Sequence, residues 1–324
     1  MDKISSGLAM IIEEKLIARK PVREPFNWNG SIVDITRLRN SRFGRVDTLD
    51  LEKNEVIRLT PHGFVVEFLG TPKSGKSNQI EMFINRLKQD EEFGDLEIEI
   101  FKPNTEAKML FSKQEDPELF HQDIVNSQER TLGRLYGTPK NESVLHRETP
   151  IAVFDRGVID SLPWTEYRFR RRDISQDIKE SLVSRLQISQ GRVHLAIGVN
   201  INSEEAYSRA LEKEGEGYIM NPRTLQQLYT YFMILDYLND NERKKVMESN
   251  PFYEDILKEI KTKEAGEPGY YDFLRLNVPY LGIECGSNLS GEEKKTDKNN
   301  NHNRVYERIR GALRARLQEY TDEE

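Results

Sequence analysis

The sequence predicts an α/β fold in which a mostly parallel five-stranded sheet lies between two layers of helices, as a three-layer sandwich. From residue 63 onward, apolar runs of strand length alternate with segments of helical periodicity. Such alternation is typical of parallel sheets that are covered on both faces. The first apolar run ends in a glycine-containing loop that leads into a helical pattern, and 324 residues suffice for one large domain with an accessory segment.

The chain is expected to have two parts. Residues 1–60 form an N-terminal extension of unknown role, and the stretch from 30 to 60 contains β-branched residues with scattered alternation, which indicates short strands. A Thr-Pro-His-Gly turn at residues 60–63 punctuates the junction. Residues 61–324 then form the α/β domain.

Five apolar runs are expected to form the strands of the sheet, at residues 64–69, 96–101, 151–154, 193–199 and 280–284. The helix after the first strand has one apolar stripe at positions i, i+3, i+4 and i+7, made of Ile80, Phe83, Ile84 and Leu87. Asn221-Pro222 begins another helix, because proline is well tolerated at the first helical position.

Three later segments differ in composition from this core. Residues 241–276 are charged and predicted to be helical, as an insertion before the last strand. Residues 286–303 are polar and lack aromatic side chains, which predicts a mobile loop. An amphipathic helix is expected to follow, with Val305 and Ile309 on its apolar stripe.

Composition restricts the partners. No apolar run approaches the ~18 residues that a membrane span requires, so no membrane partner is expected. The net charge of −7 gives no support to extended nucleic-acid binding, and the arginines between 168 and 172 are interpreted as a solvated face. The single cysteine, Cys285, has no internal disulfide partner, which is typical of a reducing, cytoplasmic location.

The sequence GTPKSGKS at residues 70–77 matches the spacing G-x-x-x-x-G-K-[ST] of a phosphate-binding loop. Glycines let the backbone N–H groups approach a phosphate, and the positive end of the following helix adds to the attraction. A chance turn is the alternative, but the buried strand before the loop and the helix after it favour a P-loop NTPase fold. We therefore expect ATP to be bound by Gly70, Thr71, Pro72, Lys73, Ser74, Gly75, Lys76, Ser77 and Asn78.

A second candidate motif is the sequence DRG at the end of the third apolar run. Side chains at the carboxyl ends of parallel strands face the ligand crevice of such folds. Asp155 is therefore predicted to hold Mg²⁺ opposite Ser77, and Arg156 to clamp a phosphate with its planar guanidinium. A surface turn with a simple ion pair is the alternative interpretation, and the buried run before Asp155 favours the functional one.

Together, GTPKSGKS, VFDRGVIDS and SRALEKEGEGYIMNPRTLQQLY resemble the thymidylate kinase and deoxynucleoside kinase superfamily, over roughly residues 63–240 and the last strand. The resemblance implies that Lys76 and Ser77 bind ATP and Mg²⁺, and that Asp155 serves the metal or the acceptor. It implies that Arg156 contacts substrate or phosphates. It also implies a lid over residues 201–223, to which Arg209 and Arg223 belong.

The chain departs from that family at two points. Where the second strand of such kinases ends in Glu-Pro, this chain has Lys102 before Pro103, and Glu106 follows three residues later. The lid carries acidic residues where several arginines are expected. Between the second and third strands, Gln128, Arg130 and Arg134 are spaced either to cover an acceptor or simply to form a polar helix face.

The function expected first is an ATP- and Mg²⁺-dependent phosphotransferase that moves a γ-phosphoryl group to a hydroxyl or phosphate of a small acceptor. The alternative is a P-loop NTPase that hydrolyses ATP as a regulatory or defence-type switch with a macromolecular partner. A nucleotide sensor without turnover is a third possibility, and the sequence favours the first two.

Overall fold

A computed structural model describes residues 31–33, 46–50, 55–59, 64–103, 116–136, 151–214, 221–266, 269–285 and 291–321. The chain divides into two compact units. The smaller contains most of a three-stranded sheet of order β1-β2-β3, formed by Ser31–Val33, Val46–Asp50 and Glu55–Leu59. β1 and β2 pair antiparallel, with Ser31 opposite Asp50.

The larger unit contains a five-stranded sheet of order β5-β6-β4-β7-β8. All four neighbouring pairs are parallel, as expected where helices connect successive strands. This confirms the predicted fold class. The strands are β4 (Phe64–Leu69), β5 (Ile98–Phe101), β6 (Ile151–Asp155), β7 (Leu195–Asn200) and β8 (Tyr280–Glu284).

Two strands begin later than their apolar runs. The N–H of Leu96 donates to the carbonyl of Phe93, and the N–H of Val193 donates to the carbonyl of Gln190. Leu96 and Val193 therefore belong to the turns that precede β5 and β7, and the apolar runs are longer than the strands.

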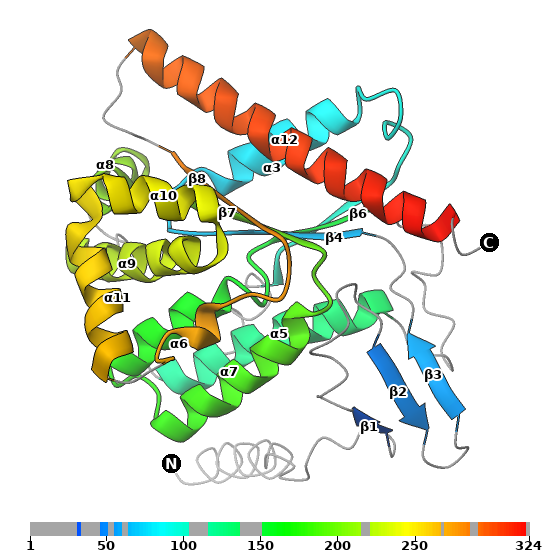
Figure 1. Ribbon diagram of the computed structural model, residues 1–324, viewed down its shortest axis with the longest axis horizontal. Coiled ribbons are helices and arrows are strands. Elements are labelled where there is room, and N and C mark those ends of the chain that lie inside the picture. The colour runs from blue at the N-terminus through cyan, green and yellow to red at the C-terminus, as the bar shows by residue number, and fades with distance from the viewer. Residues whose placement is uncertain are drawn as a thin grey trace, which may run out of the picture. The chain divides into compact units, whose positions relative to one another are not determined.

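Helices cover both faces of this sheet (Figure 1). One layer contains α3 (Lys76–Leu87) and α12 (Gly291–Thr321). The opposite layer contains α5 (Pro117–Tyr136), α6 (Ser161–Arg170), α7 (Gln176–Gln190) and α9 (Pro222–Asn239). Alternate residues of β4 serve the two cores: Val66 and Phe68 pack on the α3 side, and Val65 and Leu69 on the α9 side.

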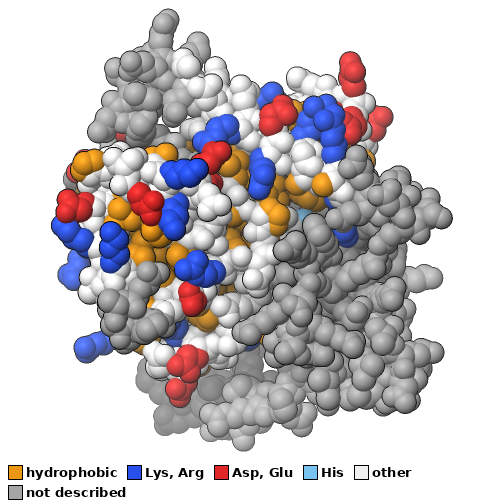
Figure 2. Space-filling view, in the orientation of Figure 1, with side chains coloured by type: hydrophobic (Ala, Val, Ile, Leu, Met, Phe, Trp, Pro, Cys, Tyr) orange, Lys and Arg blue, Asp and Glu red, His pale blue; other side chains and the backbone are white. Residues whose placement is uncertain are grey.

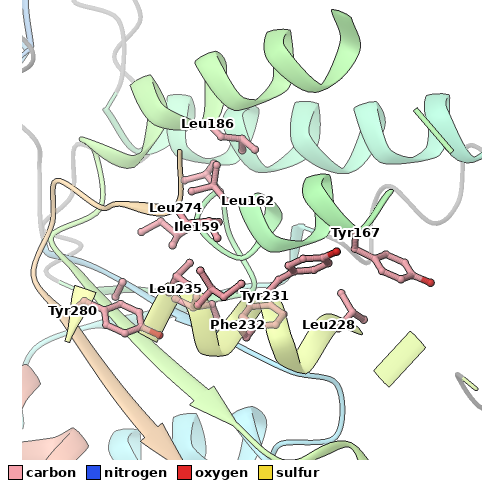
Figure 3. Close-up of a cluster of buried hydrophobic side chains, with 14 of the residues drawn as sticks. Ile159, Leu162, Tyr167, Leu186, Leu228, Tyr231, Phe232, Leu235, Leu274 and Tyr280 are labelled. Atoms are coloured by element: carbon pink, nitrogen blue, oxygen red, sulfur yellow. The ribbon is translucent and has the colours of Figure 1, made fainter. Parts of the chain in front are cut away.

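The core on the α9 side also holds the segment that follows β6. Figure 3 shows Leu228, Tyr231, Phe232 and Leu235 of α9 directed toward a group of side chains that includes Ile159. Because Ile159 is fully buried there, the turn after β6 is anchored to the helical layer as well as to the sheet.

The prediction of a mobile loop over residues 286–303 is wrong from Gly291 onward, where α12 begins; residues 286–290 lie outside the described residues. The polar side chains of this helix find partners in the fold. Asn301 is buried and donates through Nδ2 to the carbonyl of Glu284 at 3.1 Å. His302 is also buried, with Nε2 3.4 Å from Asn78 Nδ2. Composition alone does not reveal such tertiary hydrogen bonds.

The region 241–276 is helical. It contains α10 (Asn241–Ser249), the 3₁₀ turn η1 (Pro251–Tyr253), α11 (Glu254–Gly266) and a second 3₁₀ turn, η2 (Asp272–Leu274). Met247, Tyr253 and Ile260 are buried and join the core on the α9 side. In the region predicted as a lid, α8 spans Ser203–Glu214, and residues 215–220 lie outside the described residues. None of the described helices is both long enough and apolar enough to span a membrane.

Most of the arginine-rich run at the end of α6 is solvated, as predicted from the sequence: Arg170, Arg171 and Arg172 are exposed. Arg168 is buried and pairs with Asp173 at 2.8 Å, and Arg170 pairs with the buried carboxylate of Glu166 at 2.7 Å. Arg168 is therefore the exception to the predicted solvated face. On the face drawn in Figure 2, basic and acidic side chains are interspersed over the described surface.

Candidate active site

The phosphate loop connects β4 to α3 and needs backbone conformations that most residues avoid. Gly70, Lys73 and Gly75 have φ values of 133°, 60° and 95°. A Cβ on Gly70 would lie 2.0 Å from the carbonyl oxygen of Val199, so only glycine fits at the first position. Gly75 is the N-cap of α3, and the positive end of that helix therefore lies at the loop.

Lys76 occupies the inside of this loop. Its side chain is buried, and Nζ donates to the carbonyls of Gly70 at 2.9 Å and Thr71 at 2.7 Å, and to Ser74 Oγ at 3.3 Å. Burial, and next the charge of Arg156, lower the pKa of Lys76 to about 7. The acceptors bound to Lys76 Nζ are two carbonyls and one hydroxyl, all of them neutral. A bound phosphate would add a negatively charged partner.

Ser77 and Asp155 bring two side-chain oxygen atoms together. β6 lies beside β4 in the sheet, with Asp155 in register with Phe68, so the end of β6 reaches the loop. Ser77 Oγ donates to Asp155 Oδ2 at 3.4 Å. Mg²⁺ prefers oxygen ligands and completes its shell with substrate phosphates and water, so a hydroxyl and one carboxylate fit this ion.

Arg156 follows at the end of β6 with a φ of 70°, a conformation that costs free energy for a residue other than glycine. Its Nη1 pairs with Asp160 at 3.0 Å, and its guanidinium lies 6.0 Å from the centre of the Trp164 ring. The guanidinium has five N–H donors, so the pairing with Asp160 leaves donors for a phosphate.

The two predicted lid arginines differ in their surroundings. Arg209 of α8 donates through Nη1 to the carbonyl of Lys73 at 3.2 Å and pairs with Glu205 at 3.0 Å. It therefore contacts the phosphate loop directly. Arg223 is exposed in the first turn of α9.

The residues considered for the acceptor are scattered. Lys102 is exposed just after β5, and Glu106 lies outside the described residues. Gln128 is fully buried on α5, and its Oε1 accepts a hydrogen bond from Ser161 Oγ at 2.7 Å. Arg130 is exposed, and nothing is described of the Arg134 side chain.

Sequence reasoning missed three polar residues around the loop. Asp160 Oδ1 accepts from the N–H of Gly70 at 2.9 Å, and Asn200 Oδ1 accepts from the N–H of Thr71 at 3.3 Å. Glu67 lies inside β4 with its carboxylate fully buried. A charged residue in the middle of an apolar strand was the one signal in the sequence for Glu67.

Gly157→Ala should lower the free energy of unfolding by about 1–3 kcal/mol, the usual cost of forcing an extra methyl group into a packed site. A Cβ at this position would lie 2.5 Å from Glu67 Oε2. Gly133→Ala in α5 is the matched control, since a Cβ there meets nothing within 4 Å; it should be neutral or stabilising by up to about 1 kcal/mol. Urea denaturation of both variants measures the difference, and equal stabilities would contradict the prediction.

The parallel five-stranded sheet, with a glycine-bearing phosphate loop after its central strand, defines the protein as an α/β protein of the P-loop NTPase type. A comparison with protein-family models and one with curated proteins gave no match.

Solved structures of deoxyadenosine kinase from M. mycoides are similar to the chain at a low level. The structure with dCMP and dCDP has 12% identity and a TM-score of 0.44, and the match covers 75% of this chain and 98% of that one. The structure with dATP has 12% identity and a TM-score of 0.41, with 74% and 99% covered.

Proposed function

We propose that the protein is an ATP- and Mg²⁺-dependent phosphotransferase that transfers a γ-phosphoryl group to a small-molecule acceptor. The proposal rests on the hydrogen bond that Ser77 Oγ donates to Asp155 Oδ2, with 3.4 Å between the two atoms. This pair lies beside a loop that encloses the Lys76 ammonium group. Asp155 ends the strand adjacent to β4, and Arg156 follows it directly. A carboxylate and an arginine would thus lie beside the terminal phosphate.

Each group has a role that matches its chemistry. The backbone N–H groups of the loop and the N-terminus of α3 would bind the β-phosphate. Lys76 would neutralise charge shared by the β- and γ-phosphates, and Arg156 and Arg209 would contact the γ-phosphate. Mg²⁺ held by Ser77 and Asp155 would supply further charge neutralisation. In-line phosphoryl transfer needs chiefly positioning and charge neutralisation, and these residues supply both.

The acceptor is proposed to bind beyond the end of β5, beside α5 and α6. Lys102 is exposed at the end of that strand, and Trp164 of α6 lies under Arg156. A cationic side chain in this position favours an anionic acceptor, such as one that already carries a phosphate.

The alternative, an NTPase with a macromolecular partner, is favoured by one observation. The residue just after β5 is Lys102, so the carboxylate expected to contact a hydroxyl acceptor in the resembling kinases is missing at that position. Such an enzyme would release inorganic phosphate in the absence of any small acceptor.

The test is ADP production from Mg-ATP with and without a panel of nucleosides and nucleoside monophosphates. We expect one acceptor class to raise the rate, with a phosphorylated product identified by mass spectrometry. A steady rate that no acceptor changes would overturn the kinase proposal in favour of the NTPase.

Nucleotide binding should weaken as the pH rises above 7. In the free protein the pKa of Lys76 is lowered to about 7, and a bound triphosphate raises it again, so binding takes up a proton above that pH. The affinity should fall by about tenfold per pH unit between 7.5 and 9, a range in which a terminal phosphate, with its last pKa near 6, no longer titrates. Fluorescence titration with an ATP analogue measures this. Lys76→Met should bind more weakly, with no such slope; an equal slope in both proteins would exclude Lys76 as the cause.

A further inference from the structure

We propose that Glu67 and Asp160 are positioning residues for phosphoryl transfer, a buried carboxylate pair that fixes the turn carrying Asp155 and Arg156 against the phosphate loop. The inference rests on the proposed function. Neither residue belongs to the phosphate-loop motif or to the DRG sequence, and neither is expected to touch the nucleotide.

Glu67 lies within β4, and its side chain binds the turn that follows β6. Its carboxylate accepts three backbone hydrogen bonds, from the N–H groups of Gly157 at 3.1 Å, Ile159 at 3.2 Å and Asp160 at 2.7 Å. The side chain is fully buried. Burial raises the pKa of Glu67 to about 8, and the three N–H donors act in the opposite direction. One side chain thus satisfies three of the N–H donors in the turn at residues 157–160.

Asp160 connects this turn to the phosphate loop. Its Oδ1 accepts from the N–H of Gly70 at 2.9 Å, and its Oδ2 pairs with Arg156 Nη1 at 3.0 Å. The side chain is almost fully buried. Asp160 therefore bridges the first residue of the phosphate loop and the arginine proposed to contact the γ-phosphate, while its own N–H is bound by Glu67.

The turn needs this external support. Arg156 is held in the left-handed region, a conformation that persists where surrounding contacts determine it. Gly157 lies so close to Glu67 that no Cβ fits between them. Val158 and Ile159 are buried in the core on the α9 side, where Figure 3 shows Ile159 among the side chains of that cluster. The turn is therefore held by two kinds of contact: the apolar packing of Val158 and Ile159, and the hydrogen bonds to Glu67.

A buried carboxylate can also serve stability alone, and the chain offers a matched comparison. Glu166 on α6 is likewise fully buried, but its partners are Lys179 at 2.7 Å, Arg170 at 2.7 Å and Tyr270 at 2.8 Å, and none of these belongs to the phosphate loop or the turn. Replacing one carboxyl oxygen by an amide NH2 group should lower stability at either residue, whereas only the change at Glu67 should disturb the site.

The experiment compares Glu67→Gln, Asp160→Asn and Glu166→Gln with the wild-type protein. Circular dichroism and thermal unfolding measure folding, and a fluorescent ATP analogue titrated with Mg²⁺ measures the site without turnover. We expect the Mg²⁺ concentration for half-maximal nucleotide binding to rise by about 10- to 100-fold in Glu67→Gln and Asp160→Asn, the effect typical of residues that orient metal ligands. Where turnover is measured, kcat should fall more than KM rises. Glu166→Gln should lower the unfolding temperature. It should leave the Mg²⁺ concentration for half-maximal nucleotide binding, kcat and KM unchanged.

Wild-type Mg²⁺ dependence in folded Glu67→Gln and Asp160→Asn would overturn the inference, as would an equal shift in Glu166→Gln. Asp160→Asn keeps an oxygen for the N–H of Gly70 and loses only the ion pair, so it decides the matter if Glu67→Gln does not fold. A wild-type protein that binds no Mg-nucleotide would contradict the proposed function instead, so the two failures are distinguishable.

Discussion

Lys76→Met is expected to lower kcat/KM for Mg-ATP by about 100- to 1000-fold, the usual effect of removing one preorganised donor from a developing anion. The Lys76 ammonium group lies inside the loop, bound to the carbonyls of Gly70 and Thr71, and methionine retains most of the buried stem without the charge. The chain should therefore fold, bind nucleotide weakly and turn over slowly.

Lys88→Met is the control for this variant. Lys88 is exposed at the C-terminal end of α3, on the same helix, so the same chemical change is made outside the loop. It should leave kcat and KM unchanged. Wild-type turnover in Lys76→Met would remove the loop from the mechanism.

Asp155→Asn is expected to raise the Mg²⁺ requirement of turnover by about 10- to 100-fold and to lower kcat at saturating nucleotide. An amide is a weaker ligand for Mg²⁺ than a carboxylate, and Asp155 faces Ser77 across the site. Activity measured as a function of Mg²⁺ at fixed ATP gives the shift.

Two control variants accompany Asp155→Asn. Asp173→Asn removes a carboxylate paired with Arg168 at the end of α6 and should leave the Mg²⁺ requirement as it is. Ser77→Thr keeps the hydroxyl that the motif allows and should retain activity. An Mg²⁺ requirement unchanged in Asp155→Asn would show that Asp155 is not a metal ligand.

The parts of the fold that sequence predicts best are those with local signals. The apolar runs at residues 64–69 and 151–154 coincide with β4 and with all but the last residue of β6. The spacing of Gly70, Gly75 and Lys76 predicts the conformation of the loop. The two glycines occupy positions with a positive φ, and the Lys76 amine lies inside the loop.

What sequence does not reveal are contacts between distant segments. Glu67 meets the turn at residues 157–160 only because β4 and β6 are neighbours, an adjacency that no local pattern encodes. The start of α12 is polar, and reads as a loop until Asn301 and His302 are seen to bond to the end of β8 and to Asn78.

If the γ-phosphoryl group goes to an organic acceptor, a label on that group should appear in the acceptor. The protein is incubated with Mg²⁺, ATP labelled with ³²P in the γ position and the acceptor panel, and the products are separated by chromatography. We expect label in a phosphorylated acceptor, and we expect this labelled product to be lost in Lys76→Met. Label found only in inorganic phosphate, at a rate independent of every acceptor, would contradict it.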